Sequence, residues 1–168
     1  MHRFWLLPSA FSLLFILALA APASADLTAF LGRTSTPVNR PAKGFAAGAG
    51  LLIIGFEFEY SATDEDLTTP GSLAPAIKTY MFNGLAQTPF PVARMQFYGT
   101  AGGGFYHETL STEPNGDQTN FGTNIGGGAK ISLAGPLRVR VDYRVFNFRG
   151  TPRHSTVQRI YAGVNLKF

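Results

Sequence analysis

The chain has 168 residues, and its 14 Lys and Arg with 10 Asp and Glu make only 14% of it charged, where soluble domains average about 25%. A hydrophobic share of 45% and the lack of Cys exclude a disordered chain, a disulfide scaffold and a Cys-ligated metal site. The net charge of +4 is spread along the sequence, so we expect no nucleic-acid partner.

The start of the chain predicts a secretory signal peptide. A short basic start leads into an apolar stretch up to Ala20, and the small residues at 23–25 suit cleavage. The alternative is a membrane-anchoring helix, but Pro8 and the small residues near the end of the stretch leave less than the about 20 apolar residues that a helical span needs. We therefore expect a signal peptide at 1–25 and one exported domain at 26–168.

Beyond the signal peptide, apolar residues recur with a period of two, which is typical of β-strands, and no stretch keeps the 3.6-residue period of a helix. Turn-forming residues bound each of these stretches. Eight strands are predicted in chain order, at 27–33, 44–52, 56–61, 73–85, 94–108, 120–133, 137–148 and 159–168.

The third, seventh and eighth stretches alternate most clearly. In the third, Glu57 and Glu59 stand between aromatic residues. In the seventh, Val139 and Val141 share one face while Arg138 and Arg140 share the other. Because neighbours on a strand point to opposite faces, each of these strands has one apolar and one charged face.

The connections between the stretches alternate in length. Long polar connections near 34–43, 63–72, 109–118 and 149–156 alternate with shorter ones near Ile53, at 86–93 and at 134–136. An even number of strands with all long loops at one end is typical of a transmembrane barrel. The fold class predicted is all-β, an eight-stranded antiparallel up-and-down transmembrane β-barrel.

A period of two also fits a soluble barrel with an apolar interior. A soluble barrel needs a charged outer face, whereas the polar faces here carry mostly small residues with a few charges of both signs. Unpaired buried charges are costly, so mixed signs on one face predict a shared network in the lumen. Its expected members are Glu57, Glu59, Lys130, Arg138, Arg140, Asp142, Arg144 and Arg159.

The signal peptide, the strand at 55–61, the glycine-rich stretch at 100–104 and the final Phe168 together resemble one family. This family comprises the small eight-stranded bacterial outer-membrane barrel domains of the OmpA, OmpX and opacity types. One departure is Leu166, where that family often has Tyr. The resemblance implies an outer-membrane location and a Phe168 that the barrel-assembly machinery recognises. Because nothing follows Phe168, we expect no peptidoglycan-binding domain of the kind that OmpA-type proteins add.

The resemblance also implies a structural or surface-interaction role, such as envelope integrity or adhesion to an unknown extracellular ligand, without catalysis or cofactor. Two alternatives stay open, a small channel and a lipid A-modifying enzyme. Lipid A deacylases of similar outline use a His-x-Ser pair on one strand face, but His154 and Ser155 are adjacent and would point to opposite faces. We expect no metal site, because His107 and His154 lack an evident third ligand.

The long loops carry uneven charge. The simple interpretation is a solvated rim. The sharper hypothesis is that the basic residues Arg40, Arg149 and Arg153 contact lipopolysaccharide phosphates, alongside the outer-membrane lipid that surrounds the barrel.

Overall fold

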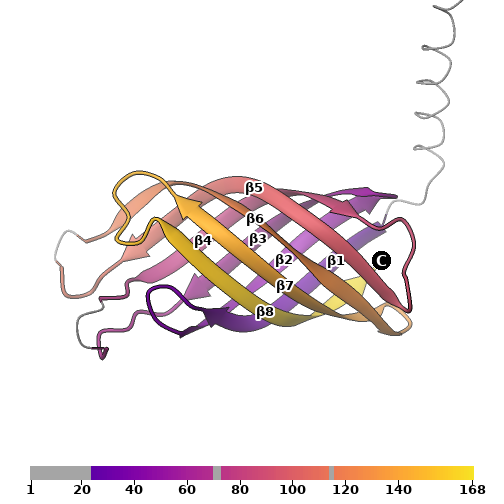
Figure 1. Cartoon of the computed structure of the whole chain (residues 1–168), viewed down its shortest axis with the longest axis horizontal. Coiled ribbons are helices and arrows are strands. Elements are labelled where there is room, and N and C mark those ends of the chain that lie inside the picture. The colour runs from indigo at the N-terminus through magenta and orange to yellow at the C-terminus, as the bar shows by residue number, and fades with distance from the viewer. Residues whose placement is uncertain (1–23, 70–72, 114–115) are drawn as a thin grey trace, which may run out of the picture.

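A computed structural model describes residues 24–69, 73–113 and 116–168 as eight long strands (Figure 1). They are β1 (Ser24–Thr34), β2 (Arg40–Leu51), β3 (Ile54–Thr63), β4 (Ala76–Gln87), β5 (Met95–Thr109), β6 (Gln118–Ala134), β7 (Leu137–Phe148) and β8 (Thr156–Lys167). Most of the predicted signal peptide lies outside the described residues, and its last two residues, Ser24 and Ala25, begin β1. The described residues contain no helix long and apolar enough to cross a membrane.

Each strand pairs antiparallel with its sequence neighbour, and β1 pairs with β8 to close the barrel. The closing register runs from Asp26 opposite Lys167 to Thr34 opposite Arg159. Beyond it, Ala25 and Phe168 exchange two backbone hydrogen bonds of 3.3 and 2.8 Å. Closure leaves no unpaired strand edge, which a membrane-spanning sheet requires. The predicted fold class is confirmed.

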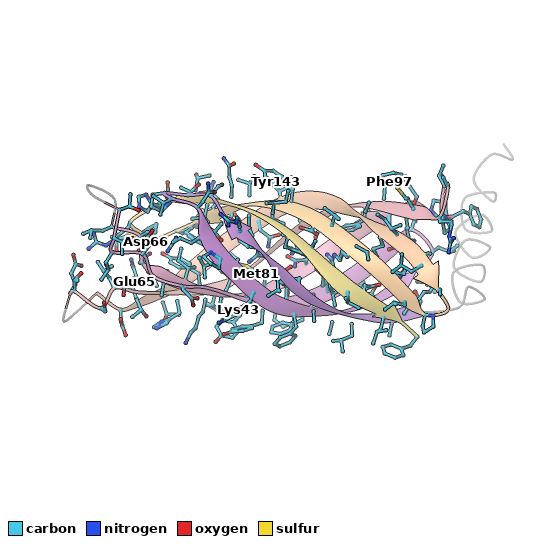
Figure 2. All side chains as sticks on the ribbon, turned by 90° about the horizontal axis from the view of Figure 1, so that it is seen from below. Lys43, Glu65, Asp66, Met81, Phe97 and Tyr143 are labelled. Atoms are coloured by element: carbon cyan, nitrogen blue, oxygen red, sulfur yellow. The ribbon has the colours of Figure 1, made fainter. Side chains whose placement is uncertain are left out.

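The two faces of each strand have the predicted orientation. On β8, Ile160 is 55% and Val164 is 53% exposed, whereas on β7 Arg140 and Arg144 are fully buried. Figure 2 shows the labelled Tyr143 and Phe97 on the outside of the wall. Around the middle of the barrel, apolar side chains therefore face outward, and the charged side chains of β7 lie inside.

The two ends of the barrel differ, as the sequence predicted. Figure 1 shows the loops after β1, β3, β5 and β7 at one end and the turns after β2, β4 and β6 at the other. The first long loop is shorter than predicted, because β2 begins at Arg40 and already pairs with β1 there. Pro41 and Gly44 resemble turn residues in the sequence, but Pro41 sits near the strand start, where a missing N–H is tolerated.

Candidate functional site: the filled lumen

The middle of the lumen holds a network of ion pairs between two strands that lie across the barrel from each other. Arg140 and Arg144 on β7 both bind Glu57 on β3, and Arg144 Nη2 lies 2.7 Å from Glu57 Oε1. Arg144 Nη1 also lies 3.0 Å from Glu59 Oε2. Because inward residues recur at every second position, each strand brings several charges into the lumen at successive levels.

Asp142 completes this centre from β7 itself. Its Oδ2 lies 3.1 Å from Arg140 Nη2, and its Oδ1 lies 2.9 Å from Arg144 Nε. Tyr98 on β5 donates its hydroxyl hydrogen to Asp142 and accepts a 2.6 Å hydrogen bond from Arg140 Nε. Each guanidinium thus meets more than one anion, which offsets the cost of burying it.

Arg159 extends the network toward the long-loop end. It forms an ion pair with Glu59 and donates a hydrogen bond to Ser61. Its guanidinium also lies 4.5 Å from the centre of the Phe146 ring, a favourable cation–π distance.

A second group of charges lies toward the short-turn end. Lys130 pairs with Asp26, and Arg138 Nη2 lies 3.4 Å from the same carboxylate. Arg138 also donates to the side-chain oxygens of Asn165 at 2.8 Å and Gln96 at 3.2 Å. Sequence reasoning missed Asp26, because it was taken only as the first residue after cleavage.

The structure therefore brings all eight residues predicted for the lumen into one lumen, with four carboxylates against five cations once Asp26 is added. The outer part of the lumen also contains an apolar cluster, which the sequence did not predict, beside buried polar residues such as Arg40 and Glu108. Its side chains come from β4, β5, β7 and β8, and Tyr106 stacks on Phe148 with ring centres 4.2 Å apart. The cluster comprises Ile77, Met81, Tyr106, Phe146, Phe148 and Val157.

Two small cavities lie inside the described part of the barrel. A cavity of about 30 Å³ is lined by Asp26, Glu57 and Arg138, and one of about 10 Å³ by Ser61, Ile77 and Phe146. A single water needs about 10–15 Å³ of such space. These two cavities therefore hold a few water molecules at most.

The three basic residues assigned to lipopolysaccharide have different surroundings. Arg149 and Arg153 are exposed in the loop at 149–155, and Arg153 pairs with Glu113. Arg40 is only 2% exposed, and its guanidinium donates to the backbone carbonyl oxygens of Thr36, Asp64 and Pro75. The prediction that Arg40 contacts lipid at the rim is wrong, because β2 starts there and points this side chain inward.

His107 and His154, which were considered as possible metal ligands, lie on different elements. His107 faces outward on β5, where its Nδ1 lies 2.8 Å from Thr119 Oγ1 and its Nε2 lies 3.1 Å from Thr109 Oγ1. His154 lies in the last long loop. Within the described residues, no group of three or more His, Asp or Glu side chains could hold a metal ion.

No family model and no curated protein matches the sequence. Solved structures do match: the N-terminal β-barrel domain of Pseudomonas aeruginosa OprF is 16% identical with a TM-score of 0.65, over 86% of this chain and 97% of that one. Neisserial surface protein A is 15% identical with a TM-score of 0.66, over 87% and 97%.

A third similar structure is the outer membrane enzyme PagL, 13% identical with a TM-score of 0.53 over 84% of this chain and 98% of that one. At these identities the likeness concerns the fold. The closed antiparallel barrel, the outward apolar faces and these matches all indicate the same fold. This chain has the fold of the small eight-stranded outer-membrane β-barrels.

Proposed function

We propose that the chain is an integral outer-membrane protein with a structural or surface-interaction role and no catalysis. In this proposal both ends of the barrel chain face the periplasm, and the four long loops face outward. A strand segment of ten residues, tilted by about 45°, spans roughly 23 Å, which suits an apolar band of about 25 Å. The outward apolar faces of β1–β8 supply that band.

The observation that carries the proposal is the filled lumen. Arg140, Arg144, Glu57 and Asp142 are each at most 3% exposed and hold one another from opposite walls. A small channel would need these side chains to part, which would leave charges unpaired in a region of low dielectric. The loops, rather than the lumen, are then the surface open to partners.

Two measurements on the full chain test this proposal. We expect the protein in the outer-membrane fraction, with faster gel migration before boiling than after it. In planar bilayers we expect no steady openings. Soluble protein whose migration boiling does not change would contradict the membrane assignment, and stable unitary currents would favour the channel.

A lipid-modifying enzyme is a second candidate, supported by the outward contact on β5. Thr109 Oγ1 lies 3.1 Å from one ring nitrogen of His107, and Thr119 Oγ1 lies 2.8 Å from the other. A hydroxyl beside a histidine that a third group orients is the arrangement of an activated nucleophile. Here it would face the lipid, where an ester bond of a membrane lipid would be the substrate.

Mass spectrometry of the membrane lipids decides between the candidates. Cells with the wild-type chain and cells with Thr109→Val or His107→Gln are compared. The enzyme candidate requires a deacylated lipid that appears with the wild type and disappears with both variants. Identical lipid profiles in the wild type and both variants would contradict the enzyme candidate and support the non-catalytic role.

A further inference from the structure

The outward face of the barrel carries charge of one sign at one end. Among the described strand residues, the carboxylates face the interior, and the outward-facing residues with a full charge are Arg33, Lys43 and Lys78. Arg33 is one residue before the end of β1, Lys43 three residues after the start of β2, and Lys78 two residues after the start of β4. All three therefore lie near the long loops, and Figure 2 shows Lys43 outside the wall, nearer Glu65 and Asp66 than Phe97.

The strand register places the two lysines on either side of a small residue. Lys43 on β2 is opposite Ala62 on β3, and Ala62 is opposite Lys78 on β4. Neighbouring strands are about 4.8 Å apart, so the two lysine backbones are separated by about 10 Å with only a methyl group between them. Two flexible ammonium groups at this separation can reach one phosphate from both sides.

Arg33 adds a third cation next to Lys43. Leu31 on β1 is opposite Lys43, so Arg33 is a diagonal neighbour two residues further toward the loops. Such diagonal neighbours are about 7–8 Å apart, within reach of long side chains.

Aromatic side chains form the next row toward the middle of the barrel. Phe45, Tyr60 and Tyr80 are opposite one another on β2, β3 and β4, and their ring centres are 5.6 and 5.1 Å apart along the row. The row below contains Phe58 and Phe82, with ring centres 5.2 Å apart. Aromatic residues with a polar edge are typical of the boundary between headgroups and acyl chains.

The three cations have no anionic partner within the described part of the chain. No ion pair joins Arg33, Lys43 or Lys78 to any described carboxylate, and Asp64, two residues beyond Ala62, forms none either. By contrast, the loop residue Arg153 pairs with Glu113. From the long-loop end toward the middle of the barrel, the wall thus presents free positive charge, then aromatic rings, then apolar side chains. A phosphorylated lipid has its phosphate, its polar backbone and its acyl chains in the same order.

We propose that this part of the wall binds a phosphorylated lipid of the surrounding membrane, with Lys43 and Lys78 holding the phosphate and Arg33 adding charge. This inference rests on the proposed outer-membrane location. Lysines that only extend their charged ends toward water would attract anionic lipids weakly, and no more than any other exposed cation of the barrel. A site that brackets a phosphate prefers a lipid with more exposed phosphate charge.

The test uses the full chain in nanodiscs of phosphatidylcholine with a minor share of lipid A, a bisphosphorylated lipid. Native mass spectrometry reads the lipid A retained on the released barrel. We expect enrichment of lipid A on the wild type and about a tenfold loss with Lys43→Ala combined with Lys78→Ala. Lys43→Arg combined with Lys78→Arg should restore it, and Lys167→Ala, which removes an exposed cation at the short-turn end of β8, should change it little.

Equal retention by wild type and the double alanine variant would overturn the site. Loss of lipid A from the wild type in millimolar inorganic phosphate would also overturn it, since free phosphate would then be the ligand. Heat-modifiable migration of the same samples reads insertion separately. An inserted barrel without enrichment contradicts only the lipid site, whereas a chain that does not insert contradicts the proposed function as well.

Discussion

At the scale of single residues, Glu57 is the anion that the two central guanidinium groups share. It contacts both Arg140 and Arg144, and its side chain is only 1% exposed. Removing one partner of a buried ion pair is strongly destabilising, because the remaining charge stays buried without compensation. The exposed ion pair of Arg153 with Glu113 contributes much less to stability, because water already solvates both groups.

Glu57→Gln should therefore lower the free energy of unfolding by about 3–5 kcal/mol. Glu113→Gln, the matched control, should cost about 1 kcal/mol or less. Urea titration of the barrel in detergent micelles, followed by circular dichroism, measures both. Equal losses for the two variants would contradict the role of Glu57 as a shared anion.

Asp66, in the loop after β3, gives a prediction about pH. Hydrogen bonds from the hydroxyl and the backbone N–H of Thr68, each 2.8 Å, lower the pKa of the Asp66 carboxyl. Because the folded pKa lies below the unfolded one, these bonds stabilise the loop fully above the unfolded pKa. The stabilisation is lost as the pH falls through the folded pKa.

Thr68→Val removes the hydroxyl donor and keeps the backbone donor. We expect the pKa of Asp66 to rise part of the way toward its ordinary value, as followed by carboxyl NMR shifts during an acid titration. Ser111→Ala, which removes a donor to Glu65 instead, should leave the titration of Asp66 unchanged. An unaltered pKa in Thr68→Val would contradict the assigned cause.

At the scale of elements, the seam between β1 and β8 depends on close packing around Phe30. Phe30 is opposite Gly44 on β2 and Gly163 on β8, and it stacks on Tyr161 with ring centres 4.0 Å apart. A Cβ at Gly163 would lie 2.7 Å from the Phe30 Cβ and would also collide with the Ala29 carbonyl oxygen. Glycine at this position lets the first and last strands approach.

Gly163→Ala should destabilise the barrel by about 1–3 kcal/mol, the usual cost of overpacking. Gly99→Ala is the control, because a Cβ there would meet no atom closer than 4.0 Å. We expect that control to be neutral or slightly stabilising. The urea midpoints of the two variants decide the point, and a Gly163 variant as stable as the control would refute the packing argument.

At the scale of the whole molecule, closure joins the first strand to the last. Phe168 continues past β8, where its backbone pairs with Ala25. Its side chain is 73% exposed on the barrel, so the side chain adds little packing within the folded protein. Recognition of Phe168 by the assembly machinery stays a prediction, which a substitution of this exposed side chain can test.

Phe168→Ala should reduce the amount of barrel that reaches the outer membrane in cells, while the purified variant refolds in detergent as stably as the wild type. Phe90→Ala is a matched control, since Phe90 has the same exposure in the turn after β4. Heat-modifiable migration of membrane fractions and of refolded protein gives the two readouts. A refolding defect as large as the defect in cells would point to packing instead of assembly.

Much of the lumen could be predicted because the alternation of faces is a local property. Glu57 and Arg140 point inward for the same reason as their strand neighbours, the two-residue period of an extended chain. Arg40 was misplaced because Pro41 resembles a turn residue, although β2 already pairs with β1 at that point. Asp26 was missed because it was taken only as the first residue after the predicted cleavage, and its partner Lys130 lies far away, 104 residues along the chain.

The sequence by itself determined the eight strands, the face that each turns outward, and the class of the barrel, because these follow from the order of neighbouring residues. Only the tertiary structure decided which carboxylate meets which guanidinium, that an apolar cluster forms in the outer part of the lumen, and that Lys43 and Lys78 flank Ala62. The physical reason is register: the stagger between paired strands sets the level of every side chain, and closure of β1 on β8 fixes that stagger for the whole ring.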